Sequence, residues 1–166
     1  LPMRCVFLVL FVACGPTPAT LNFEAPEVVF DALDAGYVGD PSLVVGVVRD
    51  GRFEPCEAGQ DLPILNGFQG GRWIHIALRV TGVRNRGRVQ LGVAGVGEAS
   101  YDIKLVRRGD FLEVFDLPIP VGRTPRLDDD QIDALAGENA HLVVSFTVGE
   151  TRMSQEHDLV LSLADH

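Results

Sequence analysis

The sequence has few basic residues, and Lys104 is its single lysine. Fourteen lysines and arginines stand against 23 aspartates and glutamates, which gives a formal net charge of −9 at pH 7. A chain this acidic repels the phosphates of nucleic acids and the headgroups of anionic lipids. We therefore expect no nucleic-acid partner.

Cysteine is scarce as well. The chain has three cysteines, which are too few for a disulfide scaffold. Two of them, Cys5 and Cys14, fall in the N-terminal segment discussed next, so Cys56 is left unpaired. We interpret Cys56 as a small buried apolar residue beside a strand, and the alternative is a reactive thiol.

Long apolar runs are missing, and the run at residues 5–13 is too short for a transmembrane helix, which needs about 20 apolar residues. It follows Arg4, and this order of charge and apolar run is typical of an export signal. The run ends in Phe11-Val12-Ala13-Cys14, which resembles the lipobox of bacterial lipoproteins. The resemblance implies that residues 1–13 form a signal peptide and that Cys14 carries lipid.

The residues after Cys14 bear on where the protein lies. Lipoproteins carry two or three acyl chains, and each buried CH₂ contributes about 0.8 kcal/mol, so the lipid alone anchors the chain to the membrane. Gly15, rather than Asp, after the cysteine fits sorting to the outer membrane. We expect an exported protein, lipid-anchored to the bacterial cell envelope, with residues 14–26 as a tether and residues 27–166 as one folded domain.

Most of the remaining chain consists of short apolar or alternating segments separated by turn residues. Asp50-Gly51 favours a two-residue hairpin turn, because both positions of that turn need positive φ. Pro63 lacks a main-chain donor, so its strand should lie at an edge or pair on one side only. Val28-Val29-Phe30 is a further candidate edge strand. The spacing predicts an all-β fold, an immunoglobulin-like antiparallel β-sandwich of about seven to nine strands.

One helical turn is expected near residues 128–136. Asp128, Asp129 or Asp130 can cap its first amides, and Gly137 can end it. Consecutive carboxylates also suit calcium, but the ligand spacing of an EF-hand is missing. We interpret the acidic residues as a helix cap.

The stretch at residues 73–81 alternates along a predicted strand, with Ile74, Ile76, Leu78 and Val80 facing the core. Trp73 then lies on the outer face, where a bare indole is costly. Either the loop with Phe68 and Gln69 or the segment 23–41 covers it, or a partner does. The candidate binding surface consists of Gln69, Trp73, His75 and Arg79.

Motifs that carry catalysis are missing from the sequence. It has no Gly-x-Ser-x-Gly elbow, His-Glu-x-x-His run, phosphate loop or Cys-x-x-Cys pair. We expect no enzymatic activity, cofactor or metal. The alternative is a periplasmic metal-binding or catalytic domain that uses surface histidines. That alternative requires at least three side chains to converge from the set His75, His141, His157, Asp102 and Glu113.

The segment 61–79, Asp-Leu-Pro-Ile-Leu-Asn-Gly-Phe-Gln-Gly-Gly-Arg-Trp-Ile-His-Ile-Ala-Leu-Arg, resembles one found in uncharacterised lipoproteins of myxobacteria and related bacteria. Those proteins share Gln-Gly-Gly, an aromatic or His pair and alternating aliphatic residues, although here Ile74 separates Trp73 from His75. The resemblance implies an exported β-sandwich without known activity. We expect a non-catalytic module that binds an envelope protein or a glycan.

Overall fold

The structure, a computed structural model, describes residues 39–67, 71–123 and 125–164. The predicted signal peptide, Cys14, the tether, the candidate strand at residues 28–30 and Gln69 lie outside the described residues. All described residues belong to one compact unit, Asp31–His166. No helix within the described ranges is long and apolar enough to cross a membrane.

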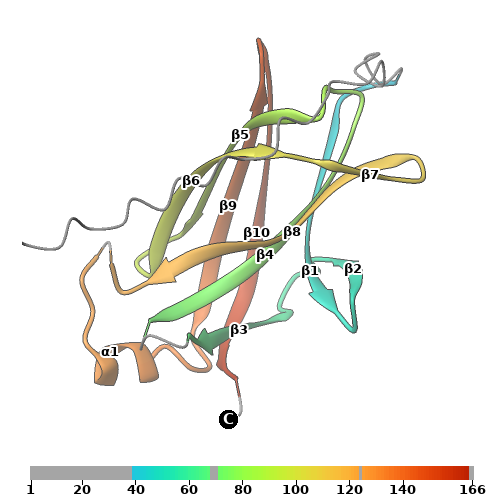
Figure 1. Ribbon diagram of the computed structural model, residues 1–166. Helices are drawn as coiled ribbons and strands as arrows, with labels where there is room; N and C mark the ends of the chain where they lie inside the picture. The colour runs from blue at the N-terminus through green and yellow to red at the C-terminus, as the bar shows by residue number, and fades with distance from the viewer. Residues whose placement is uncertain (1–38, 68–70, 124, 165–166) are drawn as a thin grey trace, which may run out of the picture. The chain divides into compact units, whose positions relative to one another are not determined.

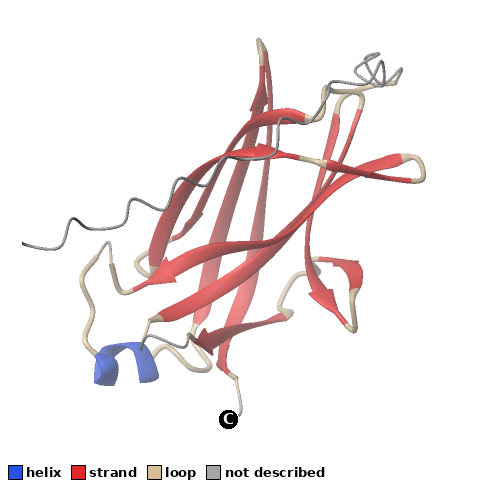
Figure 2. Ribbon diagram, in the orientation of Figure 1, coloured by secondary structure: helices blue, strands red, loops and turns tan. Residues whose placement is uncertain are grey.

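The described chain is mostly strand (Figures 1 and 2). Its elements are β1 (Ser42–Arg49), β2 (Arg52–Pro55), β3 (Asp61–Asn66), β4 (Arg72–Thr81), β5 (Arg86–Val93), β6 (Gly97–Lys104), β7 (Val106–Arg108), β8 (Phe111–Val121), α1 (Asp129–Asp133), β9 (Asn139–Val148) and β10 (Thr151–Leu163). The predicted all-β fold with one short helical turn is confirmed.

The described residues form ten strands rather than the expected seven to nine, and two of them, β6 and β7, are separated by one residue. The chain leaves β6 at Leu105, whose buried side chain and N–H bond to the Asn85 carbonyl at 2.7 Å fix a bend. On one side of this bend β6 pairs with β5, and on the other β7 pairs with β8. The chain therefore changes sheets at Leu105.

Two sheets enclose the core. Sheet A has the order β2-β1-β4-β8-β7, and sheet B has the order β10-β9-β5-β6. Figure 1 shows β4 and β8 crossing in front of β9 and β10. Buried residues from both sheets belong to one hydrophobic cluster, so the two layers share a single interior.

Strand β3 belongs to both sheets. Its first four residues pair in parallel with β10, and its last two, Leu65 and Asn66, pair antiparallel with Trp73 and Arg72 of β4. Pro63 lies opposite Ser162 of β10 alone, as its missing N–H predicts. The other strand pairs in the described part of the chain are antiparallel, and β3 joins the two sheets at one side.

The sheets also meet where β6 approaches the second half of β8. The hydroxyl of Tyr101 donates to the Pro118 carbonyl at 2.6 Å, and the Gly122 N–H donates to the Val96 carbonyl at 3.0 Å. A Cβ at Gly97 would clash with the Pro120 carbonyl, so only glycine permits this approach. The core is therefore closed at this side by side-chain and loop contacts rather than by a strand ladder.

The alternation predicted for residues 73–81 is confirmed in β4. Ile74, Ile76, Leu78 and Val80 are at most 1% exposed, and they pack with Leu142, Val144 and Phe146 of β9 in one core. Removing an aliphatic side chain of this kind from water contributes roughly 1.5–3 kcal/mol. Burial of these four side chains thus determines which side of β4 faces the core.

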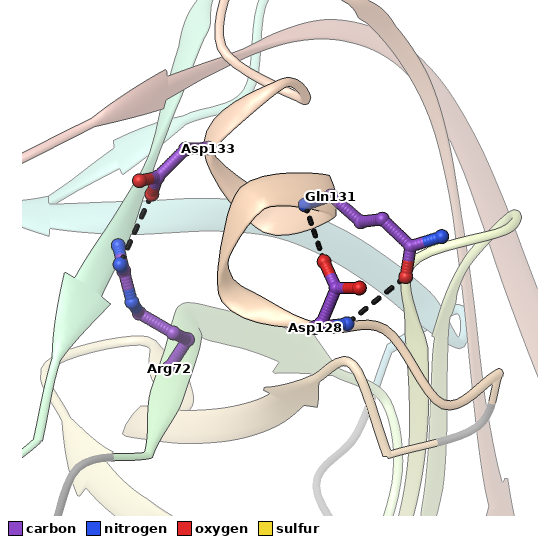
Figure 3. A network of polar contacts seen from close by, with 4 residues as sticks. All are labelled: Arg72, Asp128, Gln131 and Asp133. Atoms are coloured by element: carbon purple, nitrogen blue, oxygen red, sulfur yellow. Dashed lines mark hydrogen bonds and ion pairs between the residues drawn. The ribbon is translucent and has the colours of Figure 1, made fainter.

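The predicted turn and helix cap are also present. Asp50 and Gly51 have φ of 51° and 73°, as a two-residue turn between β1 and β2 requires. Asp128 accepts a hydrogen bond from the Gln131 N–H, and the Gln131 side chain accepts one from the Asp128 N–H (Figure 3). Arg72 binds Asp133 at 3.0 Å, which connects α1 to β4.

Candidate binding face

Three of the four predicted surface residues lie on one side of β4. Trp73, His75 and Arg79 alternate with the buried aliphatic residues and so occupy the outer face of sheet A. Ala77 lies between His75 and Arg79 on the same side and is completely buried. The outer face of sheet A is therefore covered by other side chains around Ala77, unlike an ordinary solvated sheet surface.

Trp73 packs against the ends of the loop that joins β3 and β4. A Cβ at Gly67 would lie 2.8 Å from the indole Nε1 of Trp73, and one at Gly71 would lie 2.9 Å from it. The Gly67 N–H donates to the Gly71 carbonyl at 2.7 Å, which closes the base of the loop. The two glycines thus let the main chain contact the ring, as one of the two alternatives for Trp73 expects, and the ring stays half-buried.

Three side chains hold Arg79 in place. Its Nε and Nη2 bind Oε1 of Glu113 at 2.7 and 2.6 Å, and its guanidinium lies 4.4 Å from the ring centroid of Phe53 and 4.5 Å from that of Phe111. The Glu113 side chain is only 4% exposed, so its pairing with Arg79 offsets the loss of its contacts with water. Arg79 therefore positions the two rings. Its charge is already paired with Glu113, so it is a poor site for an anionic ligand.

The same arrangement continues onto the β7–β8 hairpin. Arg108 lies 3.5 Å from Oε2 of Glu113, and its guanidinium lies 5.0 Å from the Phe115 ring centroid. Val106 is 59% exposed and Phe111 is 38% exposed. We call the set Phe53, Arg79, Val106, Arg108, Phe111, Glu113 and Phe115 the aromatic face.

Sequence reasoning missed most of the aromatic face. It selected Arg79 and treated Glu113 only as a metal ligand of the alternative hypothesis. The signal was present in β8, where Phe111 and Phe115 alternate with Leu112 and Val114, so that both sides of the strand are apolar. Apolar residues on both sides of a strand indicate that both of its faces are covered.

The side chains required by the metal or catalytic alternative lie in separate places. His75 Nδ1 lies 3.7 Å from Asp116, whereas Asp102 binds Arg88 at 2.9 Å and Glu113 belongs to the aromatic face. Within the described ranges, no group of three or more His, Cys, Asp or Glu side chains could hold a metal ion. The five residues do not converge.

The other two histidines lie on opposite faces of sheet B. His141 points outward, where its Nδ1 lies 2.8 Å from Asp158 and its Nε2 lies 3.4 Å from Glu156. The hydrogen bond with Asp158 raises the pKa of His141. His157 follows the inward alternation of β10, its Nε2 lies 3.3 Å from the side chain of Gln155, and burial lowers its pKa. The two imidazoles therefore form no surface pair.

Cys56 lies beside β1, and its N–H donates to the Val45 carbonyl at 2.9 Å. Burial raises the pKa of its thiol to about 11, against an opposing effect of Arg49. A thiol with this pKa is protonated at neutral pH and is a poor nucleophile. These contacts support the interpretation of Cys56 as a small packing residue.

Comparisons with known proteins add little to this geometry. No family model matches the sequence, and no curated protein matches it. Among solved structures, the CooA pilin subunit from enterotoxigenic Escherichia coli aligns with 74% of this chain and 99% of its own, at 10% identity and a TM-score of 0.32. A TM-score this low supports no inference, so the fold and the site rest on the pairing and contacts described above.

Proposed function

We propose that the protein is a lipid-anchored β-sandwich module of the bacterial cell envelope, without catalytic activity, that binds another envelope protein. Its anchor would be the lipid on Cys14, and its binding surface the aromatic face together with Trp73 and His75. The anchor rests on the lipobox-like sequence Phe11-Val12-Ala13-Cys14. The binding role rests on the composition and exposure of the aromatic face.

The observation that carries the proposal is the concentration of aromatic rings and arginines on one outer face. Aromatic residues and arginine are enriched at protein interfaces, and they supply many of the residues that dominate binding energy. Phe111 and Val106 are large apolar side chains left exposed beside this cluster. A rigid, partly exposed aromatic cluster costs little side-chain entropy to bury against a partner.

The contacts of the rings favour a protein over a glycan. A sugar stacks on a free aromatic face, but Arg79 covers one face each of Phe53 and Phe111, and Arg108 covers one face of Phe115. Such rings offer mainly edges and remaining apolar area, which suit the side chains of another protein.

The test compares two single substitutions with matched exposure. Phe111 on sheet A and Val143 on sheet B are 38% and 39% exposed, so Phe111→Ser and Val143→Ser remove comparable apolar surface from opposite faces. Each full-length variant would be expressed in its native host, crosslinked in intact envelopes and recovered with its bound proteins. Thermal unfolding of each purified variant would check that both still fold.

We expect Phe111→Ser to reduce recovery of a specific crosslinked protein by about thirtyfold, because a buried interface aromatic that dominates binding contributes about 2 kcal/mol. Val143→Ser should leave recovery unchanged. Equal recovery by both variants, at equal folded fraction, would refute the role of the aromatic face. Mass analysis of the envelope-extracted protein should show diacylglycerol on Cys14, and an uncleaved leader would refute the anchor.

A further inference from the structure

The outer edge of β4 has a gap between its two neighbours. On the side away from β8, β1 pairs with residues 77–81 and β3 pairs with residues 72 and 73. Ile74, His75 and Ile76 have no strand partner on that edge among the strands that the structure describes. Here β1 diverges toward β2 while β3 crosses to β10. We call this three-residue interruption the notch.

The main chain of His75 is directed at the notch. His75 lies opposite Pro118 of β8, and the Pro118 carbonyl accepts its hydrogen bond from Tyr101, on the side away from β4. Pro118 has no N–H, and opposite residues of an antiparallel pair point their main-chain groups either at each other or away from each other. The N–H and C=O of His75 therefore point away from β8, toward the gap.

A pocket of about 320 Å³ adjoins the notch. The residues that line it include Val48, Pro63 and Leu65, which are apolar and partly exposed. Pro63 also cannot donate a hydrogen bond to the His75 carbonyl. The pocket thus combines apolar walls with one main-chain donor and one main-chain acceptor.

Charged groups line the pocket, and acidic ones predominate. Asp61 and Asp116 both contribute to the lining, and the side chain of Asp116 is 74% exposed. Arg49 also lines the pocket, but its Nε lies 3.6 Å from Glu54. His75 lies 3.7 Å from Asp116. The unbalanced charge is therefore negative, and it complements a cation.

We propose that the notch binds a short extended peptide segment with lysine as its central residue. The segment would pair with His75 as an added strand, and its neighbouring residues would be small. Residues opposite each other on paired strands project to the same face, so the lysine side chain would lie on the outer side with that of His75. Its aliphatic stem would contact Val48, Pro63 and Leu65, and its ammonium would reach the acidic side chains.

This inference deepens the proposed function, because it rests on a protein partner and names the segment of that partner that is recognised. A glycan offers no alternating main-chain donor and acceptor to match His75. A peptide offers both, and only about three residues are needed to span the gap, at roughly 3.3 Å per residue.

The test is a titration of the isotope-labelled full-length protein, followed by NMR, with the probe N-acetyl-Ala-Lys-Ala-amide. Two probes serve as matched controls. One replaces lysine with norleucine, which keeps the aliphatic stem without the charge. The other carries a methyl group on the main-chain nitrogen of the lysine, which removes the central N–H. We expect the first probe to shift the amide signals of His75 and Ile76 and the methyl signals of Val48 and Leu65.

We expect N-methylation to weaken binding about tenfold and norleucine to weaken it by a smaller factor, since one hydrogen bond and one exposed ion pair are lost respectively. The double substitution Asp61→Asn and Asp116→Asn should abolish the preference for lysine over norleucine. Asparagine tolerates the positive φ of 56° at position 116, so this variant should fold.

Equal binding of the N-methylated probe, or the absence of shifts at His75 at millimolar peptide, would overturn the notch as a peptide site. The capture experiment with Phe111→Ser separates the two ideas. If Phe111→Ser still reduces recovery of the crosslinked protein while no probe binds the notch, only the inference on the notch fails. If the lysine probe binds as described while Phe111→Ser captures normally, the notch stands and the role of the aromatic face fails.

Discussion

The outer faces of the two sheets each carry an arginine paired with a carboxylate on the neighbouring strand, in very different surroundings. On sheet A, the side chains of Arg79 and Glu113 are 29% and 4% exposed and lie among phenylalanines. On sheet B, the side chains of Arg88 and Asp102 are 61% and 76% exposed. The second pair binds through two hydrogen bonds of 2.9 and 3.0 Å, so the pairs differ in burial rather than in completeness.

A paired arginine and carboxylate therefore do not by themselves mark a binding surface. An exposed pair competes with water and salt, and its contribution to stability is small. A buried carboxylate such as that of Glu113 must keep its partner, because removing Arg79 leaves a charge that water can hardly reach. The sheet A pair therefore fixes Phe53 and Phe111 in place, whereas the sheet B pair is an ordinary feature of a solvated face.

The strongest test of the contrast is Arg79→Ala against Arg88→Ala. The first substitution leaves the buried Glu113 carboxylate with only Arg108, at 3.5 Å, and we expect it to lower the free energy of unfolding by about 3 kcal/mol. The second should cause no measurable loss of stability, since the side chains of both Arg88 and Asp102 are solvated. Chemical denaturation of the purified proteins measures both values.

A control shows whether the loss comes from the stranded carboxylate. Adding Glu113→Gln to Arg79→Ala removes the unpaired charge, so part of the lost stability should return. An equal loss of unfolding free energy in Arg79→Ala and Arg88→Ala would show that the two ion pairs do not differ in burial as their exposed fractions indicate.

A smaller effect is expected from a pair of glycines on the same two faces. A Cβ at Gly46 would lie 2.3 Å from the Glu54 carbonyl and 2.7 Å from the Phe53 ring, so Gly46→Ala should destabilise the protein by about 2 kcal/mol. A Cβ at Gly92, in β5, would meet nothing within 4 Å. Gly92→Ala should stabilise by about 0.5 kcal/mol, because alanine loses less main-chain entropy.

Thermal unfolding of the two alanine variants checks this contrast. If Gly46→Ala is as stable as Gly92→Ala, then Phe53 does not pack closely over β1, and the aromatic face is looser than its contacts indicate.

The smallest effect concerns the pH dependence of sheet B. Asp158 raises the pKa of His141, so the contribution of this pair to stability is complete below 6.5 and is lost as the pH rises through the folded-state pKa. Burial lowers the pKa of His157, so that residue opposes folding as the pH falls below 6.5. NMR titration of the two imidazoles should place the His141 midpoint above 6.5 and the His157 midpoint below it.

The substitution Asp158→Asn should bring the His141 midpoint down and leave that of His157 in place. An unchanged His141 midpoint in this variant would show that its contact with Asp158 does not persist in solution.

The fold could be predicted from the sequence where local chemistry determines it. Alternation placed Ile74, Ile76, Leu78 and Val80 in the core, Asp50-Gly51 marked its turn, and Asp128 lay among the predicted caps. The crossing of β3 and the bend at Leu105 could not be foreseen, because they depend on contacts with residues distant in the sequence.

The candidate site was foreseen only along β4. Trp73, His75 and Arg79 do share a face, but the sequence does not reveal that Phe53 of β2 and Phe111 of β8 enclose Arg79. Strand order decides which side chains meet across a sheet, and a single sequence gives no strand order. The notch at His75 likewise exists only because two strands leave the same edge of β4 in different directions.

The parallel ladder between β3 and β10 has a consequence for how the chain acquires its native state. Asp61 pairs with Val160, far along the chain, so the contact between β3 and β10 cannot form until Val160 has been synthesised. Loop closure over that span is slow compared with the formation of local hairpins. A chain in which β10 has not yet been synthesised would remain open between its two layers on this side.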